Sequence, residues 1–143
     1  MTIDAHLLAL AAGRDLGVLA TLKRSGRPQL SNISYHLDID QQLVRISVTD
    51  GRAKVSNVRR DPRVSLLVSS QDGWSYAVLE GTADLSPVAA APDDATVDEL
   101  VEVYRGIRGE DHPDWDEYRQ VMVDDRRIVL RFTVDHAYGR SRQ

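Results

Sequence analysis

A short basic segment offers the clearest candidate for chemistry in this sequence. Residues 51–63, GRAKVSNVRRDPR, contain five basic side chains and one acidic one. Arg52 and Lys54 follow Gly51 at the point where a helix is expected to begin. The first N–H groups of a helix lack internal partners and carry partial positive charge, so two cations beside them favour an anion. Asn57, three residues after Lys54, is expected on roughly the same helix face.

The charge of the whole chain limits what that anion is. The 143 residues carry a formal net charge of −4. Residues 84–125 contain thirteen acids against three arginines. A compact basic island in an acidic chain favours a small anionic molecule over a nucleic acid. We therefore expect a small-molecule substrate and no nucleic-acid partner.

Several familiar reactive motifs are missing from the sequence. There is no cysteine, which excludes disulfides and thiolate metal sites. Neither GxGxxG nor GxxxxGK[ST] occurs, and GWSYA at 73–77 lacks the second glycine of a nucleophile elbow. The four histidines are scattered: His6, His36, His112 and His136. We expect no metal and assign no catalytic acid, base or nucleophile.

The expected location and domain count follow from length and hydropathy. No apolar run approaches the ~20 residues that a membrane span needs. Asp4 and His6 stand where a signal peptide would carry Lys or Arg. We expect a cytoplasmic protein without a membrane partner. Its length fits a single domain, residues 1–143.

Hydrophobic periodicity predicts a mainly β (α+β) fold. Six strands are expected, at 16–22, 29–37, 43–49, 63–69, 74–85 and 128–134. Gly81 inside the fifth suggests a bulge or bend. Helices are expected at 3–12, at 52–60, from a capping box of Thr96 and Glu99, and at 113–125. Short turns between sequential strands favour an antiparallel barrel with peripheral helices and an acidic helical insertion at about 93–125.

Two strands carry further candidate binding residues. On the second strand, Gln29 and Ser31 could offer hydrogen bonds to the edge of a ligand, with Leu30 pointing into the core. Trp74 and Tyr76 lie two residues apart, hence on one strand face, where they could line a ligand or pack at a barrel or dimer interface.

Three motifs, in this order and spacing, carry a family resemblance: GRPQLSN (26–32), RAKVSNVRRDPR (52–63) and WSYAVLEG (74–81). The chain resembles the pyridoxamine 5′-phosphate oxidase-like split β-barrel superfamily. Within it, the chain is similar to the mycobacterial-type group that uses the deazaflavin coenzyme F420 in place of FMN. The resemblance extends from about Gly17 to Gly139 and implies a six-stranded antiparallel split β-barrel of the FMN-binding type.

The resemblance also implies a homodimer, with the cofactor in a groove where two barrels meet. The pair matching Arg52 and Lys54 would hold the cofactor phosphate, with the N–H of Ala53 between them. The second strand would run beside the tricyclic ring, and the strand with Trp74 and Tyr76 would lie near the cofactor, contributed by the partner subunit. The expected cofactor-binding residues are thus Arg52, Ala53, Lys54, Asn57, Gln29, Leu30, Ser31, Asn32, Trp74 and Tyr76.

The implied function is an F420H2-dependent oxidoreductase that transfers a hydride to a small planar unsaturated acceptor. Because the cofactor carries the chemistry, no catalytic side chain is required. Two alternatives stay open: an FMN-binding protein of the pyridoxamine 5′-phosphate oxidase-like type, and a flavin or deazaflavin carrier without turnover. A pyridoxamine 5′-phosphate oxidase proper is disfavoured, because the chain is short and lacks a second basic cluster for a substrate phosphate.

Overall fold

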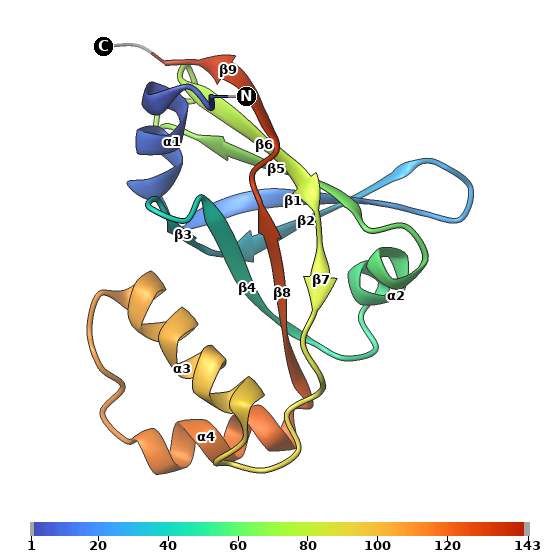
Figure 1. The fold of residues 1–143 in the computed structure, drawn as a ribbon, viewed down its shortest axis with the longest axis vertical. Coiled ribbons are helices and arrows are strands. Elements are labelled where there is room, and N and C mark those ends of the chain that lie inside the picture. Colours follow the sequence, from blue (N-terminus) through green and yellow to red (C-terminus); the bar gives the residue numbers. More distant parts are fainter. Residues whose placement is uncertain (1, 142–143) are drawn as a thin grey trace.

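The computed structural model describes residues 2–141 and shows a mainly β (α+β) fold with four helices and two antiparallel sheets in that range (Figure 1). The helices are α1 (Ala5–Ala12), α2 (Ala53–Arg60), α3 (Ala95–Arg108) and α4 (Trp115–Asp124). One sheet has the order β2-β1-β5-β6-β9 and the other β3-β4-β8-β7. The strands are β1 (Leu16–Leu22), β2 (Pro28–Ser34), β3 (His36–Asp38), β4 (Leu43–Thr49), β5 (Arg63–Ser69), β6 (Tyr76–Thr82), β7 (Asp84–Leu85), β8 (Arg127–Thr133) and β9 (His136–Arg140).

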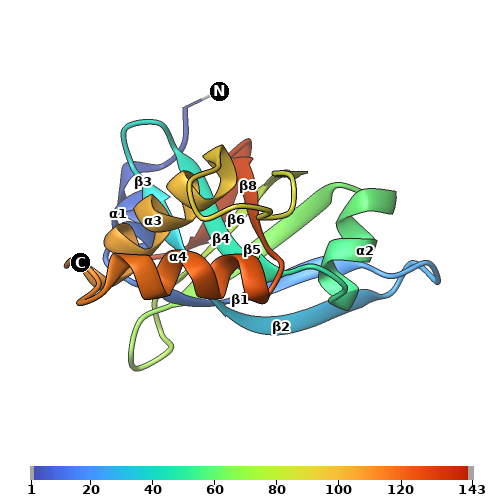
Figure 2. The ribbon, with the colours of Figure 1, turned by 90° about the horizontal axis from the view of Figure 1, so that it is seen from below.

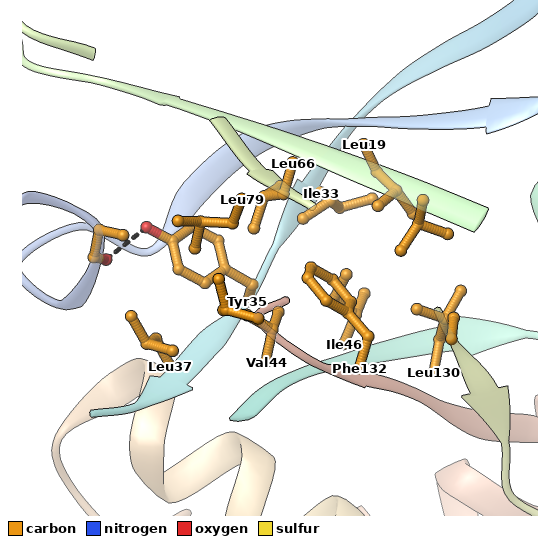
Figure 3. Packing of buried hydrophobic residues seen from close by; sticks show 14 of the residues in the cluster. Leu19, Ile33, Tyr35, Leu37, Val44, Ile46, Leu66, Leu79, Leu130 and Phe132 are labelled. Atoms are coloured by element: carbon orange, nitrogen blue, oxygen red, sulfur yellow. Dashed lines mark hydrogen bonds between the residues drawn. The ribbon is translucent and has the colours of Figure 1, made fainter. Parts of the chain in front are cut away.

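The main core lies between the two sheets (Figure 3). Alternation along each strand sends every second side chain inward, such as Val44, Ile46 and Val48 of β4. Phe132 of β8 packs against this layer. Tyr35 is fully buried, and its hydroxyl donates a hydrogen bond to the Ala11 carbonyl at 2.5 Å. That bond ties α1 to the junction between β2 and β3.

The acidic segment forms its own small core on the second sheet. Helices α3 and α4 lie together on one side of the molecule, and α2 lies on the other beside the β1–β2 hairpin (Figures 1 and 2). A separate apolar cluster joins the two acidic helices to β8, through Ala89, Val97, Leu100, Val103, Met122 and Val129. The predicted helices at 52–60 and 113–125 are confirmed to within two residues at each end.

The prediction of six strands was too low, since the described residues contain nine. The expected strand 29–37 divides at Tyr35, because Ser34 pairs with β1 whereas His36 pairs with β4 of the other sheet. The expected strand 74–85 divides in the same way into β6 and β7. β9 was missed because it is a short edge strand whose residues are mostly exposed, so it carries no hydrophobic pattern.

Gly81 marks a close approach between the two sheets rather than a bulge. A Cβ there would lie 2.4 Å from the Thr133 carbonyl oxygen and 2.7 Å from the Phe132 ring. Only a glycine lets β6 pass this near to β8.

The capping box was also placed wrongly. Asp94, not Thr96, is the N-cap of α3, and its carboxylate accepts a hydrogen bond from the Val97 N–H at 2.8 Å. Glu99 instead accepts hydrogen bonds from Arg45 of β4 and Arg131 of β8 at 2.8 Å and 2.5 Å. Glu99 thereby fastens α3 to the second sheet.

Strand pairing does not join the two sheets within residues 2–141, so closure into a split barrel stays a prediction. In the same residues, none of the helices has the length and apolar character needed to span a membrane.

Candidate functional site

The start of α2 is built to present free N–H groups. β4 ends at Thr49, and the chain turns through Gly51, whose φ of +89° favours a glycine. Arg52 is the N-cap residue, and its side chain makes no capping hydrogen bond. An N-cap residue usually supplies an oxygen acceptor, but a guanidinium only donates. The N-cap side chain therefore supplies no acceptor for the first N–H groups of the helix, at Ala53 and Lys54.

Arg52 and Lys54 have no anionic partner among the residues described. No ion pair and no side-chain hydrogen bond involves either of them in that range. Burial, and next to it the charge of Arg52, lowers the pKa of the half-buried Lys54. The nearest acid in sequence, Asp50, is already engaged by Arg59 and Arg126, whose hydrogen bonds lower its pKa. An anion bound here would relieve the mutual repulsion of the two cations.

These two cations face a pocket of about 390 Å³, here called the cation pocket. It lies where the end of β2, the end of β4 and the start of α2 come together. Its lining residues are Asn32, Ile33, Ser34, Ser47, Val48, Thr49, Arg52, Lys54, Ile107 and Arg127. Of the predicted binding residues, the structure therefore brings Arg52, Lys54 and Asn32 together.

Arg127 is a third cation of this pocket that sequence reasoning missed. The β4–β8 register places Arg127 directly opposite Thr49, at the end of β4 that leads into α2. Its Nε atom is buried and has no hydrogen-bond partner in the part of the chain that the structure describes. Its nearest acid, Asp125, is 3.7 Å from Nη2. The sequence shows only that Arg127 stands at the start of a strand. The pairing of that strand, β8, with β4 was needed to place Arg127 at the pocket.

Asn57 lies on the face of α2 that packs against the first sheet. Its Nδ2 donates hydrogen bonds to Thr21 Oγ1 at 3.1 Å and to Gln29 Oε1 at 3.0 Å. Its Oδ1 accepts a hydrogen bond from Arg60 at 3.2 Å. Asn57 is only 8% exposed, and neither it nor Gln29 lines the cation pocket. The contacts of both residues serve to dock α2 on β1 and β2.

The expectation that Leu30 points into the core was wrong. Leu30 is 63% exposed and lies opposite Ala20 of β1 on the outer side of the first sheet. Ser31 is half-buried beside Leu19, on the inner side. The predicted alternation along β2 is correct, but the side of the sheet that the core covers is that of Ser31, not that of Leu30. Asn32 shares the outer side with Leu30 and reaches the cation pocket.

Trp74 lies in the loop between β5 and β6, whereas Tyr76 begins β6. The expectation that both lie on one strand face was therefore wrong, because only Tyr76 belongs to a strand. Trp74 is 64% exposed, and Tyr76 pairs with Ser69 of β5. Neither residue lines the cation pocket.

The outer side of the first sheet exposes large apolar side chains. One row crosses all five strands: Asn32, Val18, Leu67, Val78 and Tyr138 are successive register partners. This surface, the outer face, has the exposed large side chains Leu16, Leu30, Leu67, Tyr76 and Tyr138. Several exposed large apolar side chains on one face are typical of a surface that contacts another molecule.

A second pocket, of about 260 Å³, opens on the outer face. Its lining residues are Arg14, Leu16, Gly17, Val18, Asn32, Leu67, Ser69, Ser70 and Gln71. Asn32 thus borders both this outer-face pocket and the cation pocket. The two hollows meet at one strand, so a molecule with an anionic end and a flat apolar end could occupy both.

Helix α3 closes one side of the cation pocket through Ile107. Its position is set by Gly106, where a Cβ would lie 2.4 Å from Cγ of His36 on β3. The acidic segment therefore contributes an apolar wall to the site.

Comparison with known proteins shows a family match and solved structures of similar fold. The family described as pyridoxamine 5′-phosphate oxidase matches residues 3–141. A solved F420 reductase is 23% identical, with a TM-score of 0.63 over 91% of this chain and 94% of its own. A conserved hypothetical protein of Mycobacterium tuberculosis, Rv2991, is 20% identical, with a TM-score of 0.72 over 97% and 86%. A FAD-binding protein of Mesorhizobium loti is 16% identical, with a TM-score of 0.64 over 92% and 87%.

Proposed function

The chain belongs to the pyridoxamine 5′-phosphate oxidase family, and on that premise we propose that it is an oxidoreductase using coenzyme F420. Its substrate would be a small planar unsaturated molecule that accepts a hydride. The observation that carries the proposal is the cation pocket, where Arg52 and Lys54 have no anionic partner among residues 2–141 and lie beside a helix start without a side-chain cap.

The residues of the cation pocket fit a phosphate group. A phosphate presents several acceptor oxygens, and the start of α2 offers backbone donors at Ala53 and Lys54 together with two cationic side chains. The hydroxyls of Ser47 and Thr49 lie on the same wall of the pocket. A neutral ligand would leave these cations unpaired and partly desolvated, so binding of neutral ligands is disfavoured.

The outer-face pocket fits the flat end of the same cofactor. It has apolar walls from Leu16, Val18 and Leu67, and Asn32 at its border can donate or accept a hydrogen bond at the ring edge. With the phosphate in the cation pocket, the ring would extend past Asn32 onto the outer face.

We further propose that a second copy of the chain covers the outer face. Leu16 and Leu30 are 59% and 63% exposed there, and the outer-face pocket is open on that side. A homodimer would bury both and would complete the ring site with side chains of the partner. Tyr76 lies on this face, so a partner copy would bring its own Tyr76 towards the shared surface.

When bound, reduced F420 supplies the hydride. The chain's own task is to hold and orient: Arg52, Lys54 and the start of α2 fix the anionic end, and the outer face presents an apolar floor beside which the acceptor stacks. Holding two planar molecules in contact replaces a bimolecular encounter by a fixed geometry. Coverage by the second copy would exclude water from this contact.

The decisive test is a fluorescence and absorbance titration of the purified protein with F420 and with FMN, side by side. We expect F420 to bind at micromolar concentration. Lys54→Ala and Arg52→Ala should each weaken binding by about 1.5–3 kcal/mol, the value of a charge-assisted hydrogen bond. The matched control is Arg59→Ala, which removes an exposed cation near the other end of the same helix.

Equal affinity of wild type, Lys54→Ala and Arg52→Ala would contradict the phosphate assignment. Tight FMN binding without F420 binding would favour an FMN-dependent member of the family. An enzyme is distinguished from a carrier by adding reduced F420 with and without candidate acceptors: oxidation only in the presence of an acceptor marks turnover.

A further inference from the structure

We propose that Arg127 forms a second anion subsite in the cation pocket, so that the ligand selected there carries a carboxylate beyond its phosphate. The inference deepens the proposed function and rests on it. It assigns to Arg127 the role of distinguishing a cofactor with an extended, multiply charged tail from one that ends in a single phosphate.

The position of Arg127 supports a role separate from that of Arg52 and Lys54. Arg127 comes from the start of β8, whereas the other two come from the start of α2. Thr49 lies between them: it pairs with Arg127 across the sheet, and its carbonyl accepts the Arg52 N–H at 3.3 Å. All three cations line the same pocket. They therefore approach it from two elements that are joined at Thr49.

The bonding of Arg127 leaves its guanidinium available. Within the described residues its side chain donates no hydrogen bond, and the 3.7 Å separation from Asp125 is too long for one. By contrast, the neighbouring Arg126 donates to Asp50 at 3.2 Å. A half-buried guanidinium whose protein partners are this weak gains most from an anion that enters the pocket.

The balance of charge indicates more than one anionic group. Of the residues that the structure describes, three cations and no acid line the pocket, and α2 adds partial positive charge. A terminal phosphate carries about −1.5 to −2 near neutral pH, which matches Arg52 and Lys54. FMN ends in such a phosphate, whereas the phosphate of F420 is a diester whose chain continues into carboxylates. A carboxylate of this tail would pair with Arg127 in the bidentate geometry that a guanidinium group favours.

The test compares F420 and FMN affinities of wild type, Arg127→Gln, Arg127→Lys and Arg126→Gln by fluorescence titration at one ionic strength. Arg126→Gln is the matched control, since it removes an equal charge one residue away. We expect Arg127→Gln to weaken F420 binding about tenfold or more while changing FMN affinity less than twofold. Arg127→Lys should retain part of the F420 affinity, and Arg126→Gln should bind both like wild type.

Three outcomes would overturn the subsite: unchanged F420 affinity in Arg127→Gln, an equal loss for both cofactors, or an equal loss in Arg126→Gln. If Arg127→Gln does not fold, Arg127→Lys takes its place in the comparison. F420 and FMN affinities in Arg127→Lys that both equal those of wild type would then overturn the subsite as well. If wild type binds neither cofactor, the proposed function fails first. If Lys54→Ala loses F420 binding but Arg127→Gln does not, only the subsite fails.

Discussion

Replacing Asn57 by alanine tests whether this residue serves the fold or the ligand. The variant removes two hydrogen bonds donated to Thr21 and Gln29 and one accepted from Arg60, at 3.0–3.2 Å. Each is worth about 1 kcal/mol net, and the loss leaves the 1%-exposed Thr21 without its donor. Since Gln29 and Arg60 can turn towards water, we expect a loss of about 2–3 kcal/mol in the free energy of unfolding. For a chain of this size that lowers Tm by about 4–12 °C.

The measurement is urea and thermal unfolding followed by circular dichroism, with Ser56→Ala as control at an exposed position of the same helix. The F420 affinity of Asn57→Ala is measured well below its Tm. A change in unfolding free energy below about 0.5 kcal/mol, together with a large loss of affinity, would refute this reasoning. Asn57 would then contact the ligand, as the helix spacing predicted.

Two further expectations concern the pocket and the outer face. F420 affinity should fall with rising pH, and the fall should begin below the ordinary lysine pKa of 10.5. The pKa of Lys54 is lowered in the free protein, whereas a bound anion favours the charged form of this side chain. Binding therefore takes up a proton as the pH rises through the pKa of free Lys54. Lys54→Arg should flatten this profile in titrations across pH 7–10. An unchanged profile would show that Lys54 does not cause the pH dependence of binding. The double variant Leu30→Asp, Leu67→Asp should run as a monomer in analytical ultracentrifugation, whereas Val121→Asp, at an exposed position on α4, should leave a dimer. A wild-type monomer at micromolar concentration would contradict the proposed dimer.

Local patterns were sufficient for the elements that carry their own signal. Alternation placed β4 and β5 at their observed limits. The turn glycine, the cation pair and the stop at Pro62 predicted α2 and an anion site at its start, because capping and helix dipole are properties of a few adjacent residues. Arg52 and Lys54 were named for this reason, and the structure places both in one pocket.

Orientation and long-range pairing needed the folded chain. Periodicity shows which residues share a face, but it does not say which face is covered, and so Leu30 was assigned to the wrong side. The facing direction of Asn57 depended on where β1 and β2 lie beneath α2.

What the sequence alone determined is therefore the cationic start of α2, whose residues all lie within Gly51–Lys54. What only the tertiary structure decided is the remainder of the pocket. Arg127 reaches it through the pairing of β8 with β4, and Ile107 through the packing of α3 on β3. Capping depends on neighbours along the chain, whereas strand register and helix packing depend on residues far apart in it, and these interactions exist only once the chain has folded.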